Sequence, residues 1–136
     1  VYDEGGANEA VNLAIYGRLY NWYAVNTGKL CPWGWRVPTD EDWTALTDAL
    51  GGEFGAGVKM KTADWGGTNE SGFSGLPGGG RYLFGTFSGV GDQGIWWSSS
   101  SSGGNSWFRM LTSDYGWVSR YFDFQLNGFS VRCVRD

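Results

Sequence analysis

The chain has no histidine and only two cysteines among its 136 residues. The lack of histidine excludes Ser-His-Asp and Cys-His catalysis, and it excludes zinc sites that use histidine ligands. Two cysteines are too few for a thiolate metal site, and Cys31 and Cys133 are too far apart for a Cys-x-x-Cys redox pair. They either form a disulfide that joins the first third of the chain to its C-terminus or are buried free thiols, and the sequence leaves both readings open.

Basic clusters and long apolar runs are also missing. The net charge is -4 and no block of Lys or Arg occurs, which argues against nucleic acid as a partner. No apolar run reaches the length of a membrane span, so direct membrane insertion is not expected. The chain has no signal peptide and starts at Val1 rather than Met, so we expect it to be part of a longer precursor.

Glycine and tryptophan, in contrast, are abundant. Hydrophobic residues make up 41% and charged residues 18% of the chain, which predicts one globular domain over residues 1–136. The 24 glycines predict many turns and much irregular backbone. The nine tryptophans exceed what a core of this size needs, so we expect some of them to face solvent or a ligand.

The clearest helix signal lies at Thr39, which precedes three consecutive acidic residues. Threonine is a good N-cap, and acids in the first turn interact favourably with the helix dipole. Trp43, Leu46 and Leu50 then recur at helical spacing, and two glycines follow. The pattern predicts a helix over residues 40–50.

A shorter helix is predicted earlier in the chain, over residues 17–25. Leu19, Trp22 and Tyr23 occur there at helical spacing, and an Asn-Thr-Gly sequence ends the pattern. Residues 1–15 lack periodicity, so we expect an extended entry segment.

The helical pattern stops after Gly52, and short strand-like runs then alternate with Gly/Ser turns. Residues 51–80 are expected to be mostly loop. Two helices followed by several strands predict an α+β domain. The predicted strands cover residues 81–87, 94–99, 106–111, 117–122 and 129–135.

Residues 95–136 combine a fixed frame with two insets, 112–117 and 121–127. The insets mix Tyr, Phe, Trp, Ser, Asp, Asn and Gly without a clean period. Proteins that bind through loops favour this mixture, because aromatic rings supply contact area at low entropic cost and small polar residues adapt. We therefore expect an exposed binding surface rather than core. The predicted ligand-binding residues are Asn105, Phe108, Thr112, Asp114, Tyr115, Trp117, Ser119, Tyr121, Phe122, Asp123, Phe124, Leu126 and Asn127.

Other prominent residues of this segment are assigned to the frame. For Trp96 we favour a core strand with Trp96 and Trp97 on opposite faces over a ligand platform. Arg109 and Arg120 are expected to stack on or pair with neighbouring residues, because arginine is often held in bidentate geometry.

Several motifs occur in order along the chain, namely Tyr16-Gly17-Arg18-Leu19-Tyr20-Asn21-Trp22, Arg36-Val37-Pro38-Thr39, Gly72-Phe73-Ser74-Gly75-Leu76-Pro77-Gly78-Gly79, Trp96-Trp97-Ser98-Ser99 and Gly128-Phe129-Ser130-Val131-Arg132-Cys133. Together they resemble the Fibrobacter-type major paralogous domain. That domain is similar to a branch of the C-type-lectin-like fold shared with formylglycine-generating enzymes. The resemblance implies two short N-terminal helices, followed by antiparallel strands and long Gly-rich loops.

The segment 95–136 also resembles the variable region of target proteins of diversity-generating retroelements. In such systems, adenines of a template are randomised during copying, so AAC codons yield Ser, Tyr, Phe, Asp, Gly, Leu and others. The insets largely fall in this set. Trp107, Met110, Trp117 and Gln125 cannot arise from AAC and are expected to be template-fixed. The resemblance implies an extracellular module on a bacterial surface or a phage particle, which binds a protein or glycan ligand on a cell surface.

Two alternatives belong to the same resemblance. Formylglycine-generating enzymes use a cysteine pair in the active site, but Cys31 and Cys133 do not lie where that pair would. The resemblance therefore implies a shared fold rather than a shared activity. We expect the domain to use no cofactor. The calcium-binding triplets of sugar-binding C-type lectins are absent, and a helix N-terminus explains the acidic residues 40–42 better than a metal does. A non-variable surface or carbohydrate-binding module is the alternative to a diversified one.

Overall fold

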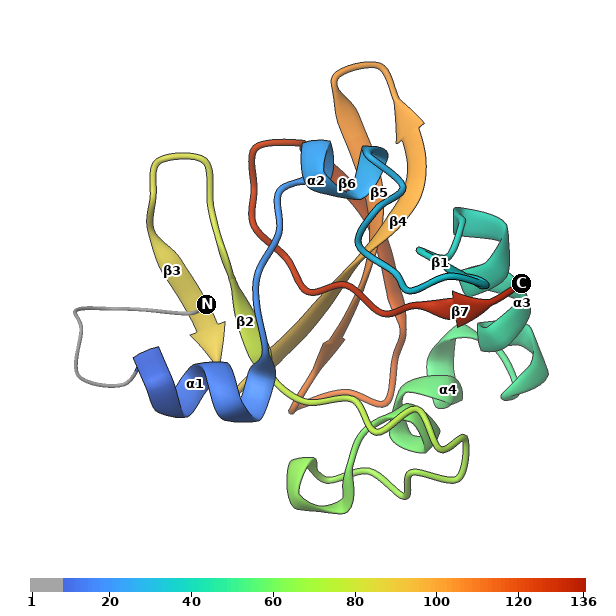
Figure 1. The fold of residues 1–136 in the computed structure, drawn as a ribbon. Helices are drawn as coiled ribbons and strands as arrows, with labels where there is room; N and C mark the ends of the chain where they lie inside the picture. Colours follow the sequence, from blue (N-terminus) through green and yellow to red (C-terminus); the bar gives the residue numbers. More distant parts are fainter. Residues whose placement is uncertain (1–8) are drawn as a thin grey trace.

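Figure 1 shows the fold in the computed structural model, which describes residues 9–136. Helices and strands are mixed, which confirms the predicted α+β class. The helices are α1 (Glu9–Tyr16), α2 (Trp22–Asn26), α3 (Asp40–Ala49) and α4 (Glu53–Met60), followed by a 3-10 turn at Ala63–Trp65. The strands are β1 (Trp35–Arg36), β2 (Gly78–Arg81), β3 (Phe87–Val90), β4 (Gln93–Ser102), β5 (Asn105–Thr112), β6 (Ser119–Phe124) and β7 (Val134–Arg135). None of the helices in this part of the chain is long and apolar enough to span a membrane.

The main sheet has five strands in the order β3-β2-β4-β5-β6. β2 and β4 pair in parallel, and the other neighbouring strands are antiparallel. A separate two-stranded sheet pairs β1 with β7, so the first third of the chain lies against the C-terminal segment (Figure 1). The order of strands leaves β6, which carries much of the predicted binding segment, at an edge of the main sheet.

Two hydrophobic clusters lie on opposite faces of the central strands. We call the cluster that contains Trp96, Leu111 and Val118 the first core, and the cluster that contains Trp97 and Phe108 the second core. Neighbouring residues of a strand point to opposite faces, so adjacent tryptophans of β4 enter different cores. The predicted core role of Trp96 is confirmed.

The N-terminus of α3 is stabilised as its sequence predicts. The Thr39 side chain accepts a hydrogen bond from the Asp42 backbone, and the Asp42 carboxylate accepts one from the Thr39 backbone, which together form a capping box. Arg36 of β1 also donates to Asp42. The helix at residues 40–50 is therefore confirmed, with its last helical residue at Ala49.

Cys31 and Cys133 form a disulfide, which settles the alternative that the sequence left open. The bridge joins residues separated by 102 positions in the sequence. Closing so long a loop stabilises the folded state by roughly 4–5 kcal/mol in the chain-entropy model. The disulfide and the β1–β7 pair both tie the C-terminal segment to the start of the domain.

The first two helices differ from their predictions. α1 forms where an extended segment is predicted, and residues 1–8 of that prediction lie outside the described residues. α1 buries no side chain, and Val11 and Ile15, one helical turn apart, are about half exposed, so packing against the core does not explain this helix. α2 begins at Trp22, later than predicted, because Tyr20 forms a β-bridge with Phe129 instead of a helical turn.

α4 and the 3-10 turn lie in the region that the sequence predicts to be loop, so this prediction and the count of two helices are wrong. Gly55 and Gly57 weaken the helical propensity of α4 by about 1 kcal/mol each relative to alanine. Packing nevertheless requires one of them, because a Cβ at Gly57 would lie 2.5 Å from the backbone oxygen of Trp117. Tertiary contacts, including burial of Ala56 and Met60, therefore stabilise α4.

The strand predictions are confirmed in the centre of the sheet and wrong at its ends. β4 and β5 form where predicted. The run 81–87 instead contains the end of β2, a turn and the start of β3. β6 begins after Val118, whose backbone bonds to α4 rather than to β5. The run 129–135 forms only isolated bridges at Phe129 and Ser130 before β7.

Candidate ligand-binding surface

The two insets expose an unusual number of large hydrophobic side chains. Between 44% and 55% of the surface of each of the following residues is accessible, namely Tyr115, Trp117, Tyr121, Phe122, Phe124 and Leu126. Asp114 is also exposed, and the predicted site residues Asn105, Thr112, Ser119 and Asp123 are half-buried. Exposed apolar side chains gathered in one short segment indicate a surface for interaction with another molecule.

Two of the predicted ligand-binding residues are interior. Phe108 packs against Trp97 and Phe129 in the second core, with ring centroids 6.1 and 5.0 Å away. Asn127 is almost completely buried. Their side chains are not part of the exposed surface, so the prediction is wrong for these two residues. The alternation of residues in β5 and after β6 does not by itself show which positions face the core.

The edge strand β6 divides the remaining residues between two faces. In an antiparallel pair, residues directly opposite each other point to the same side. Phe122 lies opposite Trp107, with ring centroids 5.0 Å apart, whereas Tyr121 lies opposite Phe108 at 6.1 Å. We call the side with Arg120, Phe122 and Phe124 the Arg120 face, and the side with Ser119, Tyr121 and Asp123 the Tyr121 face. The predicted site is therefore not one continuous surface.

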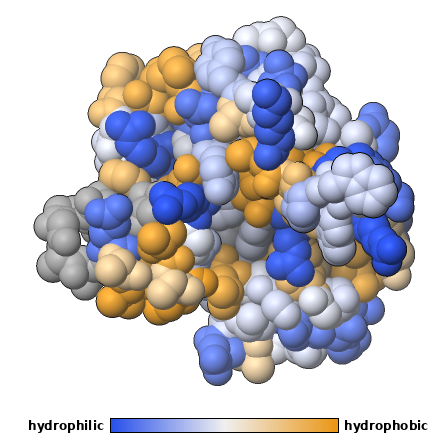
Figure 2. All heavy atoms as spheres, in the orientation of Figure 1, coloured by the Kyte–Doolittle hydropathy of each residue, from blue (hydrophilic) through white to orange (hydrophobic). Residues whose placement is uncertain are grey.

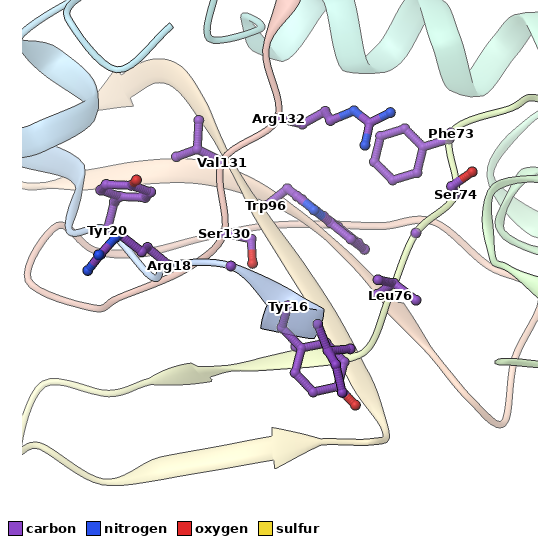
Figure 3. Close-up of a pocket in the computed structure, with 14 residues that line it drawn as sticks. Tyr16, Arg18, Tyr20, Phe73, Ser74, Leu76, Trp96, Ser130, Val131 and Arg132 are labelled. Carbon is purple, nitrogen blue, oxygen red and sulfur yellow. The ribbon is translucent and has the colours of Figure 1, made fainter. Parts of the chain in front are cut away.

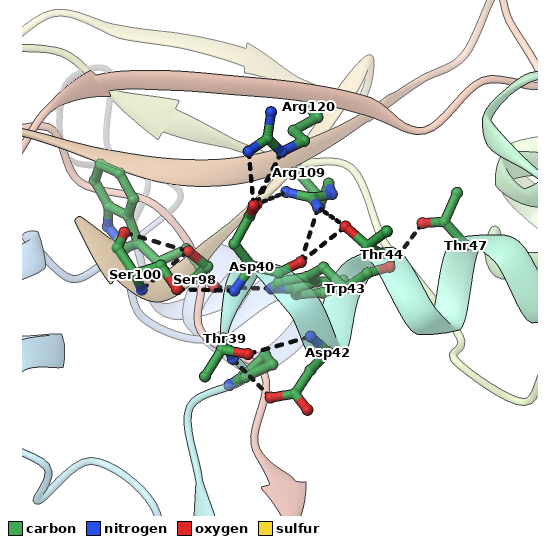
Figure 4. Close-up of polar contacts among 12 residues, drawn as sticks. Thr39, Asp40, Asp42, Trp43, Thr44, Thr47, Ser98, Ser100, Arg109 and Arg120 are labelled. Atoms are coloured by element: carbon green, nitrogen blue, oxygen red, sulfur yellow. Dashed lines mark hydrogen bonds and ion pairs between the residues drawn. The ribbon is translucent and has the colours of Figure 1, made fainter. Parts of the chain in front are cut away.

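A buried carboxylate holds β5 and β6 against α3. Asp40 accepts hydrogen bonds from Arg109 at 2.6 Å and from Arg120 at 2.7 Å (Figure 4). Arg109 also donates to Thr44, and the Arg120 guanidinium lies 3.6 Å from the centre of the Trp107 ring. Both arginines pair with neighbours, so their predicted role in the frame is confirmed.

The arginine pair also determines the charge of this carboxylate. Burial alone would raise the pKa of Asp40, but the hydrogen bonds from Arg120 and Arg109 bring the pKa below its ordinary value. Asp40 is therefore ionised and already paired with two cations. Among residues 9–136, no group of three or more His, Cys, Asp or Glu side chains is placed to hold a metal ion.

A buried lysine holds the first inset through its main chain. The Lys61 side chain is 2% exposed, and its ammonium group donates to the backbone oxygens of Thr112 at 2.9 Å and Tyr115 at 3.0 Å. Burial lowers the pKa of Lys61 from its usual value. Because the acceptors are carbonyl groups, these contacts do not depend on which side chains occupy positions 112 and 115.

α4 holds the same inset in the same manner. The Gly57 amide donates to the Gly116 oxygen at 2.9 Å, and the Val118 amide donates to the Glu53 oxygen at 2.8 Å. Val118 itself is buried in the first core. The path of the chain through this inset is thus set by backbone hydrogen bonds and one buried valine.

An aromatic cluster on this inset includes a residue from outside the predicted variable region. Tyr115 stacks on Trp117 with ring centroids 4.8 Å apart, and Phe54 of α4 meets Trp117 edge-to-face at 5.8 Å. Phe54 is 73% exposed. Phe54 is not among the residues that the sequence predicts for the site, because residues 51–80 are predicted to be loop. The one indication in the sequence is a large aromatic residue between glycine-rich positions. A cavity of about 120 Å³ adjoins this region, lined by Thr44, Thr47, Asp48, Glu53, Arg109, Val118 and Arg120.

The four residues that are expected to be template-fixed differ in burial and in contacts. Gln125 is buried and donates to the Ser106 hydroxyl at 3.0 Å. Met110 packs against the second core, and the Arg120 guanidinium stacks on the Trp107 ring. Trp117 is substantially exposed. Of these four residues only Gln125 is buried, whereas Trp107 and Met110 are half-buried, so burial alone does not separate them from the inset residues.

These features define a class of protein: a small α+β domain with a rigid frame and an exposed aromatic segment on an edge strand. The chain matches the family described as the Fibrobacter succinogenes major domain over residues 4–135, and it belongs to that family. No curated protein and no solved structure matches the chain.

Proposed function

We propose that this domain is a ligand-binding module with a C-type-lectin-like fold, whose surface side chains are diversified as in target proteins of diversity-generating retroelements. It acts by binding rather than by catalysis. The single observation that carries the proposal is the attachment of the first inset to Lys61 and α4 through backbone atoms. Such attachment tolerates exchange of the displayed side chains.

The same principle applies to β6. Its ladder with β5 uses main-chain groups, so Phe122 and Tyr121 are free to vary without loss of these hydrogen bonds. Positions whose side chains do hold the frame, such as Arg120 and Gln125, have buried partners. A domain organised in this way can change its ligand at little cost in stability.

The Arg120 face and the adjoining aromatic cluster form the proposed binding area. Aromatic side chains dominate binding energy at protein interfaces, and Trp117 and Phe122 are the strongest candidates here for anchors. Tyr121 serves a ligand that reaches the opposite side of the edge strand. The ligand is a protein or glycan on a cell surface, and the domain is displayed on a bacterial surface or a phage particle.

A pair of display libraries tests the proposal. One library randomises exposed and half-buried positions in and between the insets within the set of residues that AAC codons reach, namely Thr112, Asp114, Tyr115, Ser119, Tyr121, Phe122, Asp123, Phe124 and Leu126. The control library randomises the interior positions Phe108, Val118, Gln125 and Asn127 in the same way. We expect most members of the first library to fold and selection against a given test protein to yield binders. Comparable loss of folding in both libraries, or no binders from the folded library, would count against a displayed variable surface.

The flanking gene sequence provides an independent test. A diversity-generating system requires a near-copy of the codons for residues 95–136 that differs mainly at adenines. Finding that copy would support diversification. Its absence, together with an identical inset in independent isolates, would favour the non-variable surface module.

A further inference from the structure

A second cavity lies away from the insets. Its volume is about 370 Å³, and it is bordered by the end of α1, the loop around Phe73, strand β4 and the segment 130–132. None of the residues 105–127 lines it. Figure 3 shows the labelled side chains around this space, with Trp96 between Ser130, Leu76 and Phe73. Ligand cavities typically measure roughly 300–1,000 Å³, so this one is large enough for a small molecule.

Aromatic rings form much of the cavity wall. Phe73 meets Trp96 edge-to-face, with centroids 5.2 Å apart, and Tyr16 and Tyr20 line the side near α1. The bare backbone of Gly78 helps to keep the space open. A Cβ at this position would lie 3.2 Å from Tyr16 and 3.7 Å from the Ser130 hydroxyl.

The charged groups of the cavity have one sign. Arg18 and Arg132 both line it, and no aspartate or glutamate among residues 9–136 does. The Arg132 guanidinium lies 4.9 Å from the centre of the Phe73 ring, and it has no carboxylate partner among residues 9–136. In a protein with net charge -4, two arginines without an acid in one cavity favour an anionic ligand.

An unpaired donor lies at the same place. The indole N–H groups of Trp22, Trp43 and Trp97 each donate to a backbone oxygen, at 2.9, 3.3 and 2.8 Å. The indole of Trp96 has no such acceptor in the described part of the chain, although its side chain is more than nine-tenths buried. This N–H is not among the fully buried side-chain atoms without a partner in the described residues, so it is solvent-accessible. Because Trp96 lines the cavity, its N–H is available to an acceptor atom of a bound ligand.

We propose that this cavity binds a carboxylate-bearing monosaccharide, a molecule of the size and chemistry of a uronic acid. Arg132 pairs with the carboxylate, and the Trp96 N–H and Ser130 hydroxyl bond to ring or hydroxyl oxygens. The apolar face of the sugar ring packs against the aromatic wall. This site uses no inset residue, so the domain would carry one constant ligand site beside the variable surface.

Titration of the folded protein with glucuronate and galacturonate tests the site, with glucose and galactose as neutral controls. We expect the uronates to bind with millimolar or tighter affinity and to shift the indole N–H signal of Trp96 in proton–nitrogen NMR spectra. The neutral sugars should bind at least tenfold more weakly. Trp96→Phe assigns that signal, and a uronate that shifts other indole signals but not this one would overturn the proposal.

Matched arginine variants supply the control. Arg132→Gln should weaken uronate binding at least tenfold, whereas Arg135→Gln, which changes an exposed arginine of β7 outside the cavity, should leave binding unchanged. Both variants alter exposed side chains, so both are expected to fold. The site would be refuted if the two variants had equal effects or if the neutral sugars bound as well as the uronates. It would also be refuted if no uronate binding were detected at a uronate concentration about 20-fold above ~1 mM. None of these results bears on the display libraries.

Discussion

Replacing Lys61 with methionine should loosen the first inset and destabilise the whole domain. Hydrogen bonds from a charged donor are worth about 1.5–3 kcal/mol each, and the variant loses the two short bonds to Thr112 and Tyr115. Methionine nearly fills the space of the lysine stem and removes a buried charge, which offsets part of this loss. We expect a net destabilisation of about 2–4 kcal/mol. For a chain of 136 residues this corresponds to a drop in melting temperature of roughly 8–16 °C.

Urea denaturation and amide hydrogen exchange measure the two parts of this prediction. The unfolding free energy should fall for Lys61→Met, and the amides of residues 113–118 should lose protection before those of β4 and β5. Lys59→Met is the matched control, because Lys59 lies two residues earlier, in the last turn of α4, and its ammonium has no hydrogen-bond acceptor in the described residues. It should change stability by less than about 0.5 kcal/mol.

The reasoning fails if Lys61→Met and Lys59→Met are equally stable. It also fails if Lys61→Met destabilises the domain but leaves exchange at residues 113–118 unchanged relative to the rest. The first result would mean that the carbonyl contacts contribute nothing net. The second would mean that Lys61 supports the core rather than the inset.

Three further predictions concern the exposed aromatics, the disulfide and the α3 cap. The triple variant Tyr115→Ser, Tyr121→Ser, Phe124→Ser should fold, with a loss of unfolding free energy of about 0.5 kcal/mol per position. Phe108→Ser alone should lower the unfolding free energy by about 3–5 kcal/mol in a urea titration. An insoluble triple variant would place these aromatics in the core. Reducing the disulfide should lower the unfolding free energy by roughly 4–5 kcal/mol, and a melt insensitive to reductant would contradict the bridge. The hydrogen bond from Arg36 lowers the pKa of Asp42 from 3.8 to about 2. Since the folded pKa lies below the unfolded one, this stabilisation is present above pH 4 and is lost as the pH falls towards 2. Asp42→Asn should abolish that pH dependence, which we put at about 1 kcal/mol after allowing for solvent screening; an unchanged acid limb of the stability profile would refute it.

The sequence alone predicted those helices and strands whose stabilising contacts are made between residues close together in the chain. Thr39 and Asp42 are three positions apart and form the capping box that starts α3. The central strands β4 and β5 are apolar enough to be recognised from their runs alone. The exposure of Tyr115 and Phe124 also follows from composition, because a mixture of aromatic and small polar residues without a period does not suit either face of a buried sheet.

Tertiary structure decided everything that depends on contacts between distant positions. α4 contains two glycines that weaken it locally, and packing against residues 116–117 stabilises it. Phe108 and Tyr121 point to the same side of the sheet, but Phe108 on the inner strand β5 is covered by the second core, whereas Tyr121 on the edge strand β6 is exposed. Lys61 reaches an inset about 50 residues away, through carbonyl groups that every residue type has. Because every residue type has a backbone carbonyl, the sequence of the inset does not show that its carbonyl groups accept hydrogen bonds from Lys61. Only the folded chain reveals how the displayed residues are supported.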